Sequence, residues 1–395
     1  MIVLSKISNV PQIRFKGFTD AWEQRKLGEI TEKFEYGLNA AATDFDGVNQ
    51  YLRITDIDDE SREFNKTSLT SPDTNLALAD NYLLKQGDIL FARTGASVGK
   101  TYQYKESDGR VYYAGFLIRA RILSGFNPGF VFQSTLTKRY ENFVSITSQR
   151  SGQPGINAQE YAGFKLLLPK FEEQEQISDL FIRLDNLITL HQRKYDQVVN
   201  FKRAMLEKMF PKNGSRIPEI RFKGYTGEWE QRKLGDICEI TTGRLDANAM
   251  VPDGAYDFYT SGIAKYKIDV PAFSGPAITI AGNGATVGFM HLADGLFNAY
   301  QRTYVLSNFA ADRHYLFYEI GNRLPVKIAQ EARTGNIPYI VMDMLTDLKL
   351  YIPSSDEQKS IGMYFEKIDN LITLHQRKLQ QLKNIKKALL EKMFV

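Results

Sequence analysis

The sequence predicts a mixed α/β (α+β) protein with pseudo-twofold symmetry, in which two globular domains are joined by two long helices that pair as an antiparallel coiled coil. Three observations predict this fold class: an internal repeat, two stretches with coiled-coil periodicity, and a length of 395 residues, which is too great for one ordinary core. Hydrophobic residues make up 43% and charged residues 24%, which excludes disordered and fibrous classes.

The repeat consists of two matched blocks. Residues 11–30 (PQIRFKGFTDAWEQRKLGEI) share fifteen of twenty positions with residues 218–237 (PEIRFKGYTGEWEQRKLGDI), at an offset of 207. Residues 184–194 (LDNLITLHQRK) match residues 368–378 (IDNLITLHQRK) at an offset of 184. Agreement of this length predicts a tandem duplication.

The segments between the repeated blocks differ. They share little beyond GASVG (95–99) against GATVG (284–288), each of which follows a short β-like run. Two similar frames therefore hold two dissimilar inserts, as expected of a protein that reads two different targets with one scaffold. We divide the chain into a first domain, a first long helix, a second domain and a second long helix, at residues 1–170, 171–210, 211–353 and 354–395.

The two long helices are predicted from periodicity. Residues 171–210 contain neither Gly nor Pro, and both copies place their seam residues at alternating intervals of three and four, which is the period of a coiled coil. A helix of about 40 residues spans about 60 Å and is not stable alone in water, so each helix needs the other. The predicted seam consists of Ile177, Leu180, Leu184, Leu187, His191, Val198, Ile361, Ile368, Leu371, His375, Leu382 and Ile385.

The histidines and tryptophans of the two copies are matched. His191 and His375 interrupt both seams, and we interpret them as a polar layer that fixes helix register; a metal or pH-switch role is the alternative, but His291 and His314 show no ligand spacing. Trp22 and Trp229 are expected to anchor each domain to its helix, with stacking on bases as the alternative.

No catalytic constellation is visible in the sequence. There is no Pro-Pro pair of the kind that precedes the aromatic residue in an adenine methyltransferase loop, and neither Pro-Asp pair is followed by an acid-x-Lys nuclease motif. GASVGKT (95–101) has three residues between its glycines rather than the four of a phosphate-binding loop, and it lacks a matching Lys in the second copy. We therefore expect a non-catalytic binding protein with a tight turn at this position.

The repeated frame resembles the specificity (S) subunit of type I restriction-modification systems. The resemblance rests on the duplicated WEQRKLG block, on GDILFARTGASVGK and YLRITDID in the first insert, and on LPKFEEQEQI and IPSSDEQKSI at the start of the helices. It implies two target recognition domains, each reading one half of a split, asymmetric site in double-stranded DNA, and two helices that act as a ruler for the spacer.

The resemblance also implies partners and cofactors. Methylation is expected of adenine methyltransferase (modification) subunits, two of which would bind two equivalent surfaces of the helices. Cleavage is expected of ATP-dependent restriction/translocase subunits. S-adenosylmethionine, ATP and Mg are expected in those partners, and no cofactor or metal is expected in this chain. The alternative function is a coiled-coil scaffold that displays two protein-binding domains.

The charge and cysteine content agree with a DNA-binding protein without requiring one. Lys and Arg number 50 against 46 Asp and Glu, giving a net charge of +4. The single cysteine, Cys238, excludes an internal disulfide, and the chain lacks a membrane-length apolar run, so we expect a cytoplasmic location without membrane contact.

Candidate DNA-contacting residues are those suited to phosphate or base contacts on loops of the two inserts. Arg93 with Asn283, and Arg150 with Arg333, are expected at corresponding points of the two copies. The candidates are Arg53, Arg93, Ser97, Lys100, Gln149, Arg150 and Gln153 in the first domain and Arg244, Tyr259, Asn283, Arg302, Arg333 and Asn336 in the second.

Overall fold

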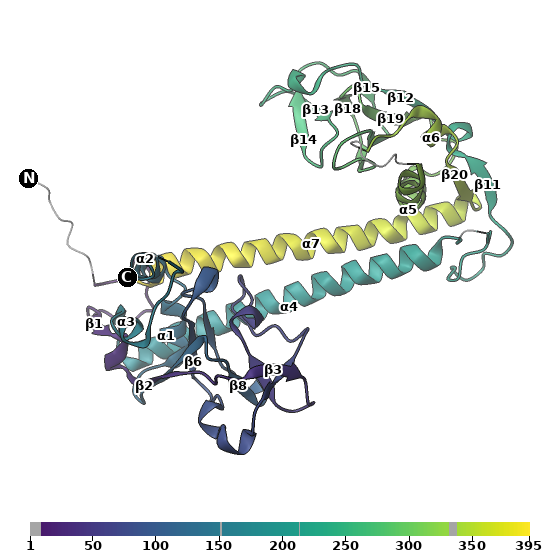
Figure 1. Cartoon of the computed structure of the whole chain (residues 1–395). Coiled ribbons are helices and arrows are strands. Elements are labelled where there is room, and N and C mark those ends of the chain that lie inside the picture. The colour runs from purple at the N-terminus through teal and green to yellow at the C-terminus, as the bar shows by residue number, and fades with distance from the viewer. Residues whose placement is uncertain (1–8, 151, 213, 332–337) are drawn as a thin grey trace, which may run out of the picture. The chain divides into compact units, whose positions relative to one another are not determined.

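The computed structural model describes residues 9–150, 152–212, 214–331 and 338–395, and it divides into two units (Figure 1). Unit 1 comprises Met1–Leu190 and Lys378–Val395, and unit 2 comprises His191–Arg377. Each unit contains one globular part and one half of each long helix, α4 (Phe171–Met209) and α7 (Ser355–Met393). The sequence-based division treats the helices as separate segments, whereas here each half-helix belongs to the globular part against which it packs.

The main sheet of unit 1 has the strand order β2-β9-β6-β7 with antiparallel neighbours; β4 and β8 pair in parallel, and β1-β10 and β3-β5 are antiparallel pairs. The strands and short helices are β1 (Glu23–Lys26), β2 (Thr31–Tyr36), β3 (Ala41–Asp44), β4 (Gln50–Leu52), β5 (Thr70–Asp73), β6 (Ile89–Ala92), β7 (Thr101–Gln103), β8 (Val111–Tyr113), β9 (Leu117–Ile122), α1 (Pro128–Ser134), α2 (Lys138–Thr147), α3 (Ala158–Ala162) and β10 (Lys165–Leu168).

Unit 2 repeats this architecture with different lengths. Its main sheet has the order β12-β19-β16-β17, and a second sheet, β14-β13-β18-β15, again contains one parallel pair, β13 with β18. The elements are β11 (Glu230–Lys233), β12 (Glu239–Thr242), β13 (Tyr256–Tyr259), β14 (Lys265–Ile268), β15 (Phe273–Ser274), β16 (Ala277–Ala281), β17 (Met290–Ala293), β18 (Leu296–Ala299), β19 (Thr303–Ser307), α5 (Arg313–Glu331), α6 (Met342–Thr346) and β20 (Lys349–Ile352).

Strand β6 is apolar throughout because both of its faces are buried. Successive side chains of a strand point to opposite faces. Ile89 and Phe91 belong to the core that includes the helices, while Leu90 and Ala92 belong to a second core with Tyr102 and residues of β4 and β8. Strand β16 occupies the same place in unit 2 and is buried at all five positions.

The start of each long helix is held by a buried ion pair. Glu173, which is fully buried, accepts two hydrogen bonds from the Arg14 guanidinium at 2.7 and 2.8 Å, and Glu357 accepts two from Arg221 at 2.6 and 2.7 Å. Removing a buried charge from water is costly unless it is paired in this way. In both units the pair connects the repeated IRFKG segment to the start of a long helix.

The glutamine after each buried glutamate closes the same junction. Gln174 donates to the Pro169 carbonyl at 2.8 Å and accepts from the Asn127 amide at 2.9 Å. Gln358 makes the corresponding bonds with the Pro353 carbonyl and the Asp312 amide. The repeated Pro-x-x-x-Glu-Gln spacing thus connects three segments of each unit.

Trp22 and Trp229 are buried anchors and do not reach the surface, as the sequence favoured; they are 2% and 1% exposed. Trp229 packs edge-to-face on Phe210, which also contacts Tyr315. In unit 1 the ring of Phe394, just after α7, meets Trp22 in the same geometry. Each domain core is therefore completed by an aromatic residue that follows a long helix.

The helix seam keeps the predicted period but differs at alternate positions. Ile177, Leu184, Ile361, Ile368 and Leu382 are buried. Leu187, Leu371 and Ile385 are instead 43%, 40% and 48% exposed, and Leu180 is only partly buried. At each of these alternate positions the next residue in the sequence is the less exposed one and lies in the seam. These seam residues are Phe181, Ile188, Phe365, Ile372, Leu379 and Lys386. The observed seam therefore steps by four and then three residues where the predicted seam steps by three and then four, and both have the coiled-coil period.

Matched polar contacts lie along the seam in each unit. In unit 2 the Nδ1 atoms of His191 and His375 are 3.2 Å apart, and the Lys202 ammonium lies 2.5 Å from Asp369. In unit 1 Lys386 lies 2.6 Å from Asp185, which is the counterpart of the second pair at the offset of 184. Val198 packs against the unit 2 core beside these groups. Each half of the helix pair thus runs antiparallel with a defined register.

The corrected seam gives a stability prediction. Phe365→Ala removes a fully buried side chain and is expected to lower the free energy of unfolding by about 3–5 kcal/mol. Leu371→Ala, a change of a half-exposed leucine, should cost about 0.5 kcal/mol or less. Urea unfolding followed by circular dichroism measures both. A larger loss in Leu371→Ala than in Phe365→Ala would mean that the seam lies at the positions predicted from the sequence.

Candidate nucleic-acid interface

Four backbone segments meet at one end of the main sheet in unit 1. The Gly37 amide donates to Leu117, the Arg93 amide to Phe116, the Ile156 amide to Arg93 and the Gly95 amide to Pro154, at 2.9–3.0 Å. We call residues 36–38, 93–99, 114–117 and 153–156 rim 1.

Unit 2 builds the same crossing with the same bonds. Gly243 donates to Thr303, Gly282 to Arg302, Ile340 to Gly282 and Gly284 to Pro338, at 2.8–3.2 Å. We call residues 243–245, 282–288, 300–303 and 338–340 rim 2. The bonds align the two rims position by position, so that Arg93 corresponds to Gly282 and Phe116 to Arg302.

Glycine is required where the first two segments cross. A Cβ atom at Gly37 would lie 2.1 Å from the Ala114 carbonyl oxygen, and one at Gly243 would lie 1.9 Å from that of Ala299. The GASVG segment forms the tight turn between β6 and β7, and GATVG forms the turn between β16 and β17. Gly95 and Gly99 of the first turn, and Gly284 and Gly288 of the second, have positive φ, which glycine adopts without strain. The backbone of each rim is thus closely fixed, and only its side chains differ.

Rim 1 presents Arg93 over the ring of Tyr36. The Arg93 guanidinium lies 4.8 Å from the ring centre of Tyr36, and among the described residues no carboxylate forms an ion pair with it. A guanidinium held by a ring face keeps its hydrogen-bond donors available for a phosphate or a guanine. Ser97 is half-buried in the turn, and Gln153 is exposed beside Gly95.

Two predicted contact residues are wrong, because they are buried. Lys100 is 6% exposed; its ammonium donates to the Ile57 carbonyl at 3.0 Å and pairs with Asp59. Tyr259 is 1% exposed in the core around β18, and burial raises the pKa of its hydroxyl to about 12. Neither side chain is exposed enough to contact DNA in this structure.

Other candidates of the first domain are engaged with neighbouring groups. Arg53 makes two hydrogen bonds to Asp56 at 2.8 and 2.9 Å, and this carboxylate raises the pKa of the guanidinium. Arg150 is exposed and pairs with Glu160, and it also donates to the carbonyls of Thr147 and Gln149. Contact with DNA by Arg53 or Arg150 would compete with these carboxylates.

In the second domain Arg302 and Arg244 are exposed on rim 2, and Asn283 accepts a hydrogen bond from the Ser261 hydroxyl at 2.6 Å. Asn283 corresponds to Thr94 rather than to Arg93. Each of the two forms an isolated antiparallel β-bridge with the last segment of its rim, Thr94 with Gly155 and Asn283 with Tyr339. The expected Arg93–Asn283 correspondence is therefore off by one position. Arg333 and Asn336 lie outside the described residues.

Sequence reasoning missed the exposed aromatic residues of the rims. Phe116 is 63% exposed, Tyr339 is 45% exposed and Tyr36 is 43% exposed. Phe116 offers no hydrogen bond, and the sequence does not distinguish Tyr36 and Tyr339 from the buried tyrosines of the chain. The alignment of YAGF (113–116) with AYQR (299–302), which the backbone bonds establish, was not recoverable from the sequence because the two stretches are unrelated.

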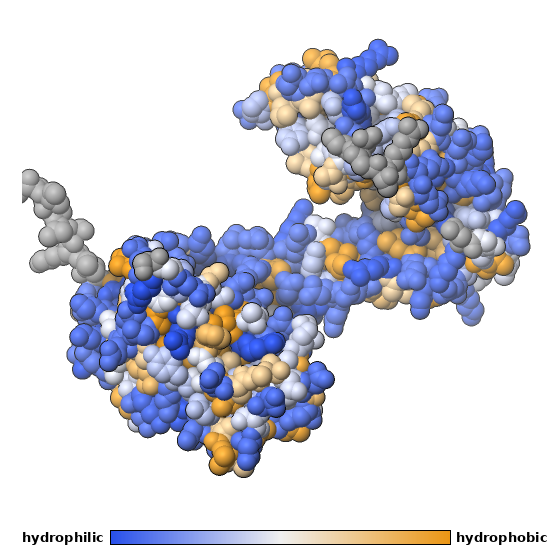
Figure 2. Space-filling model, in the orientation of Figure 1, coloured by the Kyte–Doolittle hydropathy of each residue, from blue (hydrophilic) through white to orange (hydrophobic). Residues whose placement is uncertain are grey.

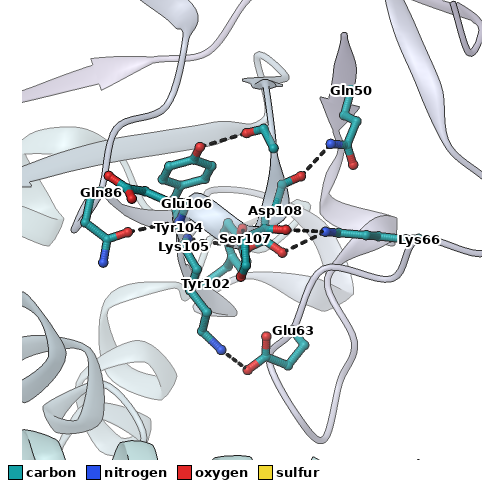
Figure 3. A network of polar contacts seen from close by, with 11 residues as sticks. Gln50, Glu63, Lys66, Gln86, Tyr102, Tyr104, Lys105, Glu106, Ser107 and Asp108 are labelled. Carbon is teal, nitrogen blue, oxygen red and sulfur yellow. Dashed lines mark hydrogen bonds and ion pairs between the residues drawn. The ribbon is translucent and has the colours of Figure 1, made fainter. Parts of the chain in front are cut away.

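Two acidic groups whose pKa is raised by burial, Glu319 and Cys238, belong to the core of unit 2. Burial raises the pKa of Glu319 to about 7 and that of the Cys238 thiol to about 12. Figure 3 shows the polar network around Asp108, which accepts from the Tyr102 hydroxyl at 2.6 Å and pairs with Lys66 at 3.0 Å. These contacts stabilise the turn between β7 and β8. Within the described ranges no three His, Cys, Asp or Glu side chains are grouped to hold a metal, and no helix is long and apolar enough to cross a membrane.

Two similar units, each with a four-stranded main sheet and part of both long helices, define a tandem two-domain protein, and comparisons with known proteins give its family. Residues 19–200 and 226–384 match the family described as type I restriction modification DNA specificity domain. The chain therefore belongs to this family and is the specificity subunit of a type I restriction-modification system, with two DNA target recognition domains. This assignment favours DNA recognition over a protein-binding scaffold, and specificity subunits are the non-catalytic components of such enzymes.

Individual relatives cover different shares of the chain. The type I restriction enzyme EcoDI specificity subunit of Escherichia coli is 36% identical over 145 residues, which are 37% of this chain and 31% of that one. The MjaVIII specificity subunit of Methanocaldococcus jannaschii is 22% identical over 93% of this chain and 91% of its own. Among solved structures, the S subunit from M. genitalium has the same fold, with a TM-score of 0.72 and 14% identity over 98% of this chain and 99% of that chain.

The rims predict half-site-specific effects of mutation. Arg93→Ala is expected to weaken binding about 5- to 100-fold through the half-site read by unit 1, and Arg302→Ala through the half-site read by unit 2. Fluorescence anisotropy with duplexes altered in one half-site at a time measures this.

Arg25→Ala, on β1 outside the rim, is the charge-matched control and should leave half-site preference unchanged. If Arg93→Ala relaxed both half-sites equally, the two units would not read DNA independently.

Proposed function

We propose that each unit reads one half of a bipartite, asymmetric DNA site through its rim, and that the paired helices set the distance between the halves. The supporting observation is that the rims share their backbone hydrogen bonds but not their exposed side chains. A common frame with changed side chains suits two readers of different sequences.

The ruler role is supported by the polar contacts of the seam. His191 with His375, Lys202 with Asp369 and Lys386 with Asp185 each join α4 to α7 within one unit. A polar layer in a coiled coil opposes slippage of register, because a slipped helix leaves charged groups without partners. A fixed register gives a fixed spacer.

We further propose that two adenine methyltransferase subunits dock on the outward faces of the helices. Leu187, Leu190 and Ile385 are half-exposed in unit 1, and their counterparts Leu371, Leu374 and Phe201 are half-exposed in unit 2. Hydrophobic patches interrupt the hydrophilic surface of the helices in Figure 2. Repeated apolar patches of this kind mark protein interfaces.

The remaining chemistry falls to partner proteins in this proposal. The methyltransferase subunits would supply S-adenosylmethionine, and restriction/translocase subunits would supply ATP and Mg. The complex would act in the cytoplasm, on cellular and invading DNA.

A methylome tests the reading function. The chain is expressed with the methyltransferase subunit encoded beside it in a host free of adenine methylation, and modified adenines are mapped by long-read sequencing. We expect a split motif of two short defined halves around a gap of constant length. Methylation of a single continuous motif would contradict the two-reader proposal, and methylation with a variable gap would contradict the ruler.

Docking is tested by one substitution in each unit. Leu190→Asp with Leu374→Asp should reduce co-purification of methyltransferase at least tenfold, since burial of two charges in an apolar interface is unfavourable. The matched control is Asn200→Asp with Asn384→Asp, exposed counterparts in unit 2 and unit 1, which adds the same two negative charges while leaving both apolar patches unchanged. Retained helix content by circular dichroism shows that the fold is intact; full assembly of the Leu variants would exclude these patches as the interface.

A further inference from the structure

Phe116 is an apolar side chain held in solvent by a fixed backbone. It lies in the turn between β8 and β9, where its carbonyl accepts from Arg93 at 3.0 Å and the following Leu117 amide donates to Ala114 at 2.9 Å. The ring nevertheless remains 63% exposed. A ring placed in this way gains nothing from folding, since it stays in water.

The corresponding position of unit 2 carries a different side chain on the same backbone. The Arg302 carbonyl accepts from Gly282 at 2.8 Å, which is the counterpart of the Arg93–Phe116 bond, and the Arg302 side chain is exposed. One position of the fold is thus fixed in its backbone, exposed in both units and changed from an aromatic ring to a guanidinium. These are the properties expected of a position that reads a base.

The chemistry of the two side chains indicates what each one reads. A phenylalanine ring forms no strong hydrogen bond and is not attracted to phosphate, and the apolar feature of the major groove is the 5-methyl group of thymine. Arg93, whose amide is bonded to the Phe116 carbonyl and whose guanidinium lies over the Tyr36 ring, provides hydrogen-bond donors on the same rim. Arginine at the same position suits the O6 and N7 acceptors of guanine.

We propose that Phe116 contacts the 5-methyl group of a thymine in the half-site read by unit 1, and that Arg302 contacts a guanine at the equivalent place in the other half-site. This inference rests on the proposed function and deepens it, because it assigns a base identity to one position of each reader.

Deoxyuridine provides the test, because it differs from thymidine only in lacking the methyl group. Duplexes carrying the recognised sequence are prepared with one thymidine at a time replaced by deoxyuridine, and binding to the complex with methyltransferase is measured. We expect one replacement, within the unit 1 half-site, to weaken binding about fourfold, the effect of one buried methyl group.

Phe116→Ala should weaken binding of the thymidine duplex similarly and abolish the effect of that one deoxyuridine, while Phe116→Leu retains part of it. Leu78→Ala, which changes an even more exposed apolar residue outside rim 1, is the control and should retain the full effect. The inference is overturned if no deoxyuridine position in that half-site matters, or if the effect persists in Phe116→Ala. If either result is found while the wild-type protein still binds the recognised sequence specifically, the Phe116 inference fails and the proposed function stands. If the wild-type protein shows no preference for the recognised sequence, the inference and the proposed function both fail.

Discussion

Neither long helix can bury its apolar seam alone, and this constraint organises the whole chain. Each unit solves it by combining one half of α4 with one half of α7, so the seam of each half-helix is covered within its own unit. The buried Glu173 and Glu357 then connect the helix starts to the repeated IRFKG segments through Arg14 and Arg221. The sheets, and with them the rims, are built on this base.

The rims show how a fold can hold its geometry while its chemistry changes. The glycines at the crossing permit a backbone approach that no side chain would allow, and four amide bonds fix the segments in each unit. Side chains on such a crossing point outward from a rigid frame, so they can differ without loss of the core. The exposed side chains of the two rims can therefore differ without changing the backbone that carries them.

The duplication, the long helices and the anchor tryptophans could be predicted from the sequence, since each is encoded by local pattern. The seam was predicted with the correct period but the wrong alternate positions, because Leu187 and Ile188 are both apolar and only packing decides between them. Lys100 and Tyr259 were predicted to contact DNA because of their residue types. In the fold Lys100 is buried against the Ile57 carbonyl and Tyr259 against the ring of Phe297, and the sequence does not show these tertiary contacts. Phe116 was missed because exposure of an apolar residue depends on tertiary structure.

The division of unit 1 between two distant parts of the chain has a consequence for biosynthesis. Residues 378–395 supply Leu382, Met393 and Phe394 to the core that surrounds Trp22. The ribosome makes them only after the whole of unit 2, whose segments are contiguous in sequence. The domain synthesised first is therefore the last to be completed. During translation its apolar core stays partly exposed to solvent until residues 378–395 are made, and an exposed core of this kind favours aggregation.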